Sequence, residues 1–257
     1  MKNITVMKEN QIGIVAINRP PANALSQELI RELSQIFDQL AEDQDIRVIL
    51  LQGEGKFFSA GADIKEFSAI QSAEDFSNSS QLGQQTFAKI ESSTKPVIAV
   101  IHGAALGGGL ELAMACHIRL VSNEAKLGLP ELQLGLIPGF GGTIRLPHLL
   151  GPGKAAEMLF TSEPLSGIEA VQWGLANHAY PEEELFNRAK ELAHKIAKKS
   201  PIALKAAIKQ LQFSHSGQYY LGLEEEMKQF GVLFNTQDAQ EGIQAFIEKR
   251  EPKFRGK

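Results

Sequence analysis

The alternation of apolar and polar positions predicts a strand pair followed by a helix at the start of the chain. Short β-rich runs at residues 4–6 and 12–17 flank the polar turn 8–11, which is the pattern of a β-hairpin. Residues 19–23 contain two prolines, and the residue before a proline disfavours helix. From Ser26 onward, apolar residues recur at the spacing of an amphipathic helix: Leu29, Leu33, Ile36 and Leu40.

A second pattern occurs three times in the middle of the chain. Each occurrence, which we call a pass, begins with a continuous apolar run and leads into a glycine-bearing loop. A continuous apolar run is typical of a strand covered on both faces. The runs are residues 48–51, 97–101 and 118–121, and the loops include residues 53–63, 103–109 and 135–142. Sequence identity between the passes is negligible, so we infer a repeated strand–turn–helix unit. Such units stack into layers of sheet covered by helices, which predicts an α/β fold.

The last part of the chain has mainly the sequence pattern of helices. Helical patterns prevail from about Gly151, with Ser166 and Glu169 in the arrangement of a capping box, and Ser200-Pro201 interrupts them. We therefore expect a mixed α/β body over residues 1–195 and a helical region over residues 196–257. No low-complexity linker separates the two, so we do not expect the tail to fold independently.

Composition narrows the class of protein. The chain has 257 residues, 43% of them hydrophobic and 22% charged, which is typical of a globular protein. Its 26 basic and 30 acidic residues argue against general electrostatic binding of nucleic acid. The single cysteine, Cys116, excludes an intrachain disulfide and fits a reducing compartment. We find no apolar run of secretory or membrane-spanning length and expect a cytoplasmic protein.

Three consecutive glycines, residues 107–109, stand between a predicted buried strand and an apolar helix. Glycines there allow close approach of a ligand to the backbone, and the amides of a helix N-terminus favour an anion. A tight turn or close packing explains them equally well. Neither these glycines nor residues 139–142 match the phosphate-binding or dinucleotide-binding patterns.

Two glutamates have unusually apolar neighbours. Glu111 follows the triple glycine and is flanked by leucines and alanine, while Glu131 follows Pro130 among further leucines. A poorly solvated carboxylate favours its protonated form and suits acid–base chemistry near neutral pH. The alternative is that each is an acid in the first turn of a helix.

Other reactive side chains show no catalytic spacing. The histidines His102, His117 and His148 form no metal-binding motif, so we expect no metal site. Ser59 is not in a nucleophile elbow, and Cys116 fits a core position. The lysines of residues 190–209 fit a solvated helix face, with phosphate binding as the alternative.

Three segments together are similar to the signature segments of the crotonase (enoyl-CoA hydratase/isomerase) family: residues 57–65, 102–113 and 129–139. Residues 173–177 and 248–250 also resemble the family, and the similarity covers essentially the whole chain. The resemblance implies a crotonase-type spiral of repeated ββα units. It also implies a C-terminal helical region used in trimerisation, with hexamers as dimers of trimers.

The resemblance also implies roles for individual residues. The oxyanion hole for a thioester oxygen maps to the backbone amides of Ala60 and Gly108, and the family's catalytic glutamates map to Glu111 and Glu131. The substrate- and CoA-binding positions map to Asn23, Ala24, Ala60, Gly61, Ala62, Asp63, Ile64 and Gly108. Coenzyme A is part of the substrate, so no further cofactor is implied.

Retention of both glutamates favours an enoyl-CoA hydratase that interconverts trans-2-enoyl-CoA and 3-hydroxyacyl-CoA in fatty acid oxidation. The alternatives are an enoyl-CoA isomerase, a hydratase of the methylglutaconyl-CoA type, an RNA-binding protein, or an acyl-CoA binder without activity. The net charge of −4 and the two acids argue against the last two. No motif defines the acyl pocket, which we expect among residues 67–90.

Overall fold

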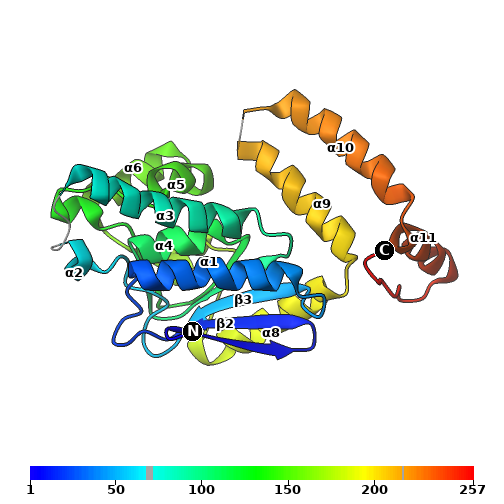
Figure 1. Cartoon of the computed structure of the whole chain (residues 1–257), viewed down its shortest axis with the longest axis horizontal. Helices are drawn as coiled ribbons and strands as arrows, with labels where there is room; N and C mark the ends of the chain where they lie inside the picture. Colours follow the sequence, from blue (N-terminus) through cyan, green and yellow to red (C-terminus); the bar gives the residue numbers. More distant parts are fainter. Residues whose placement is uncertain (68–71, 216) are drawn as a thin grey trace.

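The structure is a computed structural model that describes residues 1–67, 72–215 and 217–257. Figure 1 shows a body of sheet and helices from which a helical tail extends. Within the described residues, none of the helices is long and apolar enough to cross a lipid bilayer.

A mostly parallel sheet forms the centre of the body. Its strands, in the order β1-β2-β3-β4-β6-β9, are β1 (Ile4–Glu9), β2 (Ile12–Ile17), β3 (Val48–Gly53), β4 (Val97–Ile101), β6 (Ile118–Ser122) and β9 (His178–Tyr180). Strands β1 and β2 pair antiparallel as the predicted hairpin, and the other neighbours pair parallel.

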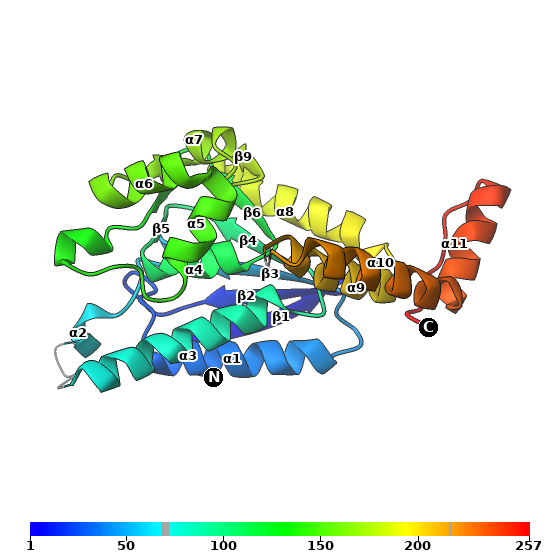
Figure 2. The same cartoon turned by 90° about the horizontal axis from the view of Figure 1, so that it is seen from above.

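Helices cover both faces of this sheet, which explains its continuous apolar runs. In the register, Ile14 lies beside Leu50 and Leu50 beside Ile98, and all three pack against α8 (Glu182–Ala197). Alternate residues such as Leu51 and Ala99 face the other way and join α1 (Gln27–Glu42) and α3 (Ala73–Glu91) in the larger core. Figure 2 shows α8 on one side of the sheet and α1 and α3 on the other.

A smaller sheet lies beside the first and completes the repeated units. It has the order β5-β7-β8, with β5 (Ala104–Leu106), β7 (Lys126–Gly128) and β8 (Leu165–Ser166). Two passes therefore contain two strands, β4 with β5 and β6 with β7. In the pass that starts at β3, the second strand is reduced to a bridge between Ser59 and Ala105. The predicted α/β spiral of ββα units is confirmed.

The remaining helices begin and end at recognisable signals. The side chain of Ser26 caps α1 by accepting from the amide of Leu29, and Ser166 with Glu169 forms the predicted capping box. These helices are α2 (Ile64–Phe67), α4 (Gly108–Ala115), α5 (Gly142–Leu150), α6 (Pro152–Thr161), α7 (Gly167–Gln172), α9 (Pro201–Leu211), α10 (Tyr219–Phe234) and α11 (Gln237–Glu248), with single 3₁₀ turns at Glu131–Leu134 and Gln212–His215.

The tail begins after α8. Because α8 packs on the central sheet, the expected boundary near residue 195 lies in the last turn of a body helix. The chain changes direction at Ser200, which caps α9, and Pro201 is the first residue of that helix. Helices α9, α10 and α11 then extend from the body (Figure 1). The division into two regions stays a prediction.

Candidate active site

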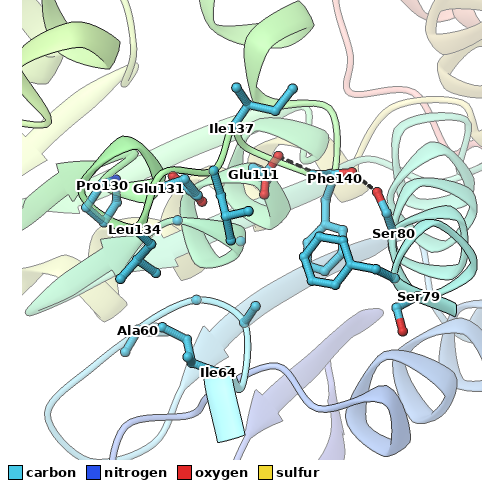
Figure 3. Close-up of a pocket in the computed structure, with 17 residues that line it drawn as sticks. Ala60, Ile64, Ser79, Ser80, Glu111, Pro130, Glu131, Leu134, Ile137 and Phe140 are labelled. Carbon is cyan, nitrogen blue, oxygen red and sulfur yellow. Dashed lines mark hydrogen bonds between the residues drawn. The ribbon is translucent and has the colours of Figure 1, made fainter. Parts of the chain in front are cut away.

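The candidate site is a pocket of about 130 Å³ between the body's glycine-rich turns and α3. Its wall is mostly apolar and carries two carboxylates. The lining residues are Ala60, Gly61, Ala62, Ile64, Phe76, Ser79, Ser80, Gly107, Gly108, Glu111, Pro130, Glu131, Leu134, Leu136, Ile137, Gly139 and Phe140. Figure 3 shows both glutamates on one side of the pocket, with Ala60 and Ile64 opposite them.

Glu111 lies in the first turn of α4 and is only 1% exposed. Its Oε1 accepts hydrogen bonds from the amides of Phe140 and Gly142, each at 2.7 Å. Burial, with a smaller contribution from the charge of Glu131, raises the pKa of Glu111 to about 7, although the two amides oppose the shift. The sequence-based prediction of a poorly solvated carboxylate is confirmed for this residue.

Glu131 begins the 3₁₀ turn Glu131–Leu134 at the edge of the pocket. Its Oε2 is buried and has no hydrogen-bond partner in the part of the chain that the structure describes. Burial raises the pKa of this carboxyl above its usual range. Gly107 makes room for it, because a Cβ on Gly107 would lie 2.8 Å from Glu131 Oε1, and its φ of +52° also favours glycine.

Two residues that line the pocket, Ala62 and Gly108, have backbone amides without an internal partner among the described residues. Gly108 is the first residue of α4, so its N–H has no acceptor within the helix. The Ala62 amide lies close by, since a Cβ built on Gly108 would stand 3.4 Å from Ala62 N. None of the hydrogen bonds among the described residues uses either N–H.

The structure contradicts Ala60 as an oxyanion donor. Its amide donates to the carbonyl of Ala22 at 2.9 Å and is therefore already committed within the fold. Ala60 remains at the pocket as a lining residue. The free amide of this loop belongs to Ala62, which sequence reasoning placed among the CoA-binding positions only.

The remaining predicted CoA-binding positions divide into lining and supporting residues. Gly61, Ala62 and Ile64 line the pocket, and Ile64 is 53% exposed. Asp63 forms an ion pair with Arg19 at 2.6 Å, and Arg19 also donates to the carbonyl of Ala24. These contacts hold residues 19–24 beside the loop, but binding of CoA by Ala24 or Asp63 stays a prediction.

Asn23 has a structural use that the sequence does not reveal. Its side-chain amide donates to the carbonyls of Glu54 and Phe57, and its Oδ1 accepts from the amide of Arg19. The residue is only 2% exposed, and these bonds hold residues 19–23 against residues 54–57. Binding of CoA at Asn23 stays a prediction.

Other candidate side chains are buried or hydrogen-bonded within the fold. Ser59 is buried and donates to the carbonyl of Asn23, and burial raises the pKa of the Cys116 thiol to about 12. His117 Nδ1 accepts from the amide of Val97. The described segments contain no cluster of three His, Cys, Asp or Glu residues suited to a metal ion.

The segment in which we expected an acyl pocket supplies only part of the wall of this pocket. Residues 67–90 contribute Phe76, Ser79 and Ser80 from α3, while 68–71 lie outside the described residues. Residues 134–140 supply the rest of the apolar wall, including Ile137 and Phe140. The sequence analysis placed residues 135–142 in a glycine-bearing loop but assigned neither Ile137 nor Phe140 to a site.

The fold and the pocket together define a class. Two desolvated carboxylates stand beside two free amides in an α/β spiral, which suits an enzyme that polarises a carbonyl group and transfers protons next to it. The family description "Enoyl-CoA hydratase/isomerase" matches residues 7–257. The chain belongs to this family, within the crotonase superfamily.

Individual relatives agree over their full length. A protein of Bacillus subtilis (strain 168) named probable enoyl-CoA hydratase is 52% identical, with 100% of each chain covered. The short-chain-enoyl-CoA hydratase of Clostridium acetobutylicum is 39% identical over 97% of this chain and 96% of that protein. The crystal structure of an enoyl-CoA hydratase from Bacillus anthracis has a TM-score of 0.95 at 38% identity and covers 100% of both chains.

The burial of Glu111 predicts a pH-dependent stability. A folded-state pKa near 7 lies above the unfolded value of 4.5, so the native state binds more protons between these values and stability falls as pH rises. Glu111→Gln keeps the oxygen that accepts from Phe140 and Gly142 but cannot ionise. Its free energy of unfolding relative to wild type should rise between pH 5 and pH 8 by on the order of 2–3 kcal/mol.

Urea unfolding at the two pH values measures this difference. Glu169→Gln is the control, because bonds from Ser166 lower the pKa of Glu169, so this carboxyl is largely ionised in both the folded and the unfolded state above pH 5. Its stability difference from wild type should therefore stay nearly constant between pH 5 and pH 8. An identical stability difference for Glu111→Gln at pH 5 and pH 8 contradicts the buried-acid assignment.

Proposed function

We propose that this protein is an enoyl-CoA hydratase that adds water reversibly to trans-2-enoyl-CoA thioesters. The observation that carries the proposal is the pair Glu111 and Glu131. Both carboxyls are desolvated, both line one pocket, and Glu131 Oε2 has no partner among the described residues. A water molecule is the natural partner for a buried carboxylate oxygen in a polar corner of a pocket.

The amides of Ala62 and Gly108 support the first part of the proposed reaction. They would donate to the thioester oxygen, where negative charge develops as water adds to C3. The N-terminus of α4 adds its positive end at the same place, and preorganised donors of this kind lower the barrier by favouring the developing oxyanion. Polarisation of the thioester makes C3 electrophilic.

The two carboxyl groups support the proton transfers. Water bound between them loses one proton to a carboxylate as its oxygen bonds to C3, and a carboxylic acid delivers one proton to C2. The product gains the elements of one water. One carboxyl group has then gained a proton and the other has lost one, so the pair returns to its starting protonation when one proton passes between them. Coenzyme A leaves with the product, so the proposed reaction uses no other cofactor.

The proposal favours hydration over double-bond isomerisation. An isomerase needs one group to carry a proton between C2 and C4, whereas hydration needs a group for the water and a group for C2. The pocket has two such groups, which is the observation that separates the alternatives. The cytoplasmic location and a role in fatty acid oxidation stay predictions.

We further propose that the chain assembles as a trimer or a dimer of trimers through its tail. The tail exposes large apolar side chains, among them Met227 at 70%, Phe230 at 76% and Phe246 at 86%. Exposed apolar surface of this kind is typical of an interface between subunits. The apolar face of the body is covered by its own helices, whereas these residues have no such cover within the described chain.

Replacement of the acids tests the reaction. Glu111→Gln and Glu131→Gln should each lower kcat for hydration of crotonyl-CoA by at least about 10²-fold, because each removes one titratable group. The losses should not multiply in the double variant, since the two groups act as one unit. Exposed Glu163 lies outside the pocket, and Glu163→Gln serves as the control.

Parallel assays of hydration and of 3-enoyl-CoA isomerisation decide between the alternatives. Undiminished hydration by Glu131→Gln, or loss of isomerisation in only one variant with 3-enoyl-CoA as the better substrate, would refute the hydratase assignment.

Replacement of Gly108 tests the amide pair. Gly108 is the first residue of α4, where proline fits a helix, so Gly108→Pro removes the N–H with little damage to the helix. A Cβ at Gly108 would lie 3.0 Å from the Phe140 ring, so Gly108→Ala is the control that adds the same Cβ and keeps the amide. We expect kcat of the proline variant to fall about 10²–10³-fold below that of the alanine variant. Equal kcat values would remove Gly108 from the oxyanion hole.

Analytical ultracentrifugation tests the assembly. The pair Met227→Asp and Phe230→Asp on α10 should shift the protein from trimer or hexamer to smaller species, because a buried interface tolerates no unpaired charge. Met7→Asp on β1 introduces the same charge at a residue that is 55% exposed and serves as the control. A stable wild-type monomer at micromolar concentration would defeat the proposal.

A further inference from the structure

The loop of residues 138–142 holds Glu111 on one side and is itself held on the other. Its amides at Phe140 and Gly142 donate to Glu111 Oε1. On the far side, the carbonyl of Phe140 accepts from Arg145 Nη1 at 2.9 Å. The guanidinium of Arg145 therefore contacts the same short loop that positions the buried acid.

Arg145 is anchored in turn by the C-terminal end of α3. Its Nη2 and Nε donate to Glu91 Oε2 at 2.8 and 3.3 Å. The side chain of Arg145 is 14% exposed and that of Glu91 is 40% exposed, so the pair is partly shielded from water. The planar guanidinium can contact a carboxylate and a carbonyl at once, which a lysine ammonium does less well.

The guanidinium of Arg145 lies directly against Gly141 of the loop. A Cβ on Gly141 would lie 2.4 Å from Arg145 Nη1, and the φ of Gly141 is +103°. The residue between the two donating amides therefore has no side chain, and Arg145 occupies the space that a side chain would take.

Arg145 also lies outside the substrate pocket. Together with Met114, Ile144 and His148 it lines a separate hollow of about 440 Å³ behind Phe140, and it is not among the described residues that line the pocket of Glu111. A change at Arg145 should therefore reach the substrate only through the loop and the acid.

We propose that Arg145 is a positioning residue for hydration, which fixes the loop amides that orient Glu111, and that Glu91 holds Arg145 in place for this task. The inference rests on the proposed function, because it assigns Glu111 a part in the reaction. Misplacement of a catalytic group by about 1 Å can cost 10²-fold in rate, so the anchor has kinetic consequences without touching substrate.

The charged groups around Glu111 and Arg145 determine the direction in which the pKa of Glu111 shifts when Arg145 is replaced. Glu111 is faced by Glu131 from the 3₁₀ turn and by Arg145 from α5, and Arg145 is faced by Glu91 from α3, with His148 in the same hollow. The positive charge of Arg145 lowers the pKa of Glu111. Loss of this charge, and of the amide geometry it maintains, should move the titration of Glu111 to higher pH.

The experiment compares Arg145→Gln, Arg145→Lys and Glu91→Gln with wild type in crotonyl-CoA hydration over a range of pH. Asp38→Asn is the matched control, because the ion pair of Asp38 with Lys89 at 2.7 Å also fastens α3 but does not contact the loop. The titration of the Glu111 carboxyl is followed separately by ¹³C NMR, with its signal identified by its loss in Glu111→Gln.

We expect kcat of Arg145→Gln to fall about 10-fold to 10²-fold with KM within about twofold, and the Glu111 titration to move to higher pH. Arg145→Lys should recover part of the loss. Glu91→Gln should show a smaller loss that does not add to that of Arg145→Gln, because the two side chains act in series. Asp38→Asn should retain wild-type kcat.

Unchanged kcat and an unchanged Glu111 titration in folded Arg145→Gln would overturn the inference, as would an equal loss in Asp38→Asn and Glu91→Gln. If Arg145→Gln does not fold, the kcat and the Glu111 titration of Glu91→Gln test the inference in its place. Failure of the wild-type protein to hydrate any 2-enoyl-CoA would refute the proposed function instead, and the NMR titration would still report whether Arg145 acts on Glu111.

Discussion

The burial of one carboxyl group, that of Glu111, is the constraint on which the rest of the site depends. At 1% exposure this group has lost most of its hydration, and two amides replace water on one of its oxygens only. Those amides come from a loop that needs a left-handed glycine at Gly141 and an anchor at Arg145. The burial of this single ionisable group therefore constrains three parts of the chain: residues 138–142, the start of α5 and the end of α3.

The triple glycine serves packing and chemistry at once. Gly107 adopts a positive φ and makes room for Glu131, Gly108 presents a free amide, and a Cβ on Gly109 would lie 2.3 Å from the carbonyl of Ser59. The two explanations that the sequence left open, ligand approach and close packing, therefore apply to different members of the run. The close packing of these glycines also places the N-terminus of α4, with its partial positive charge, at the pocket that holds both carboxyls.

Much of the fold follows from local patterns, because a strand buried on both faces has a continuous apolar run and a helix buried on one face has apolar residues at a regular spacing. The hairpin, the helix that Ser26 caps and the apolar runs of β3, β4 and β6 were all predictable in this way. Glu111 was also recognisable, since its neighbours along the helix are apolar. The positions of Phe140 and Ile137 at the pocket were not, because residues 134–140 have no periodicity and Phe140 becomes buried only through its contacts with Gly83 and Phe87 of α3.

The sequence by itself determined the hairpin, the first helix, the apolar runs of β3, β4 and β6, the family resemblance and the two acids, since each depends on residue types at short spacing. The short strands β8 and β9, in a stretch with helical patterns, were not predicted. Only the tertiary structure decided which backbone amides are free. The Ala60 N–H is committed to the carbonyl of Ala22 and the Asn23 side chain to Glu54 and Phe57, so the amide that faces the pocket from this loop belongs to Ala62. The same holds for Arg145, whose contacts with Glu91 and Phe140 bring together three separate segments. Every residue but proline carries the same amide, so its availability depends on partners that are distant along the chain and adjacent only after folding.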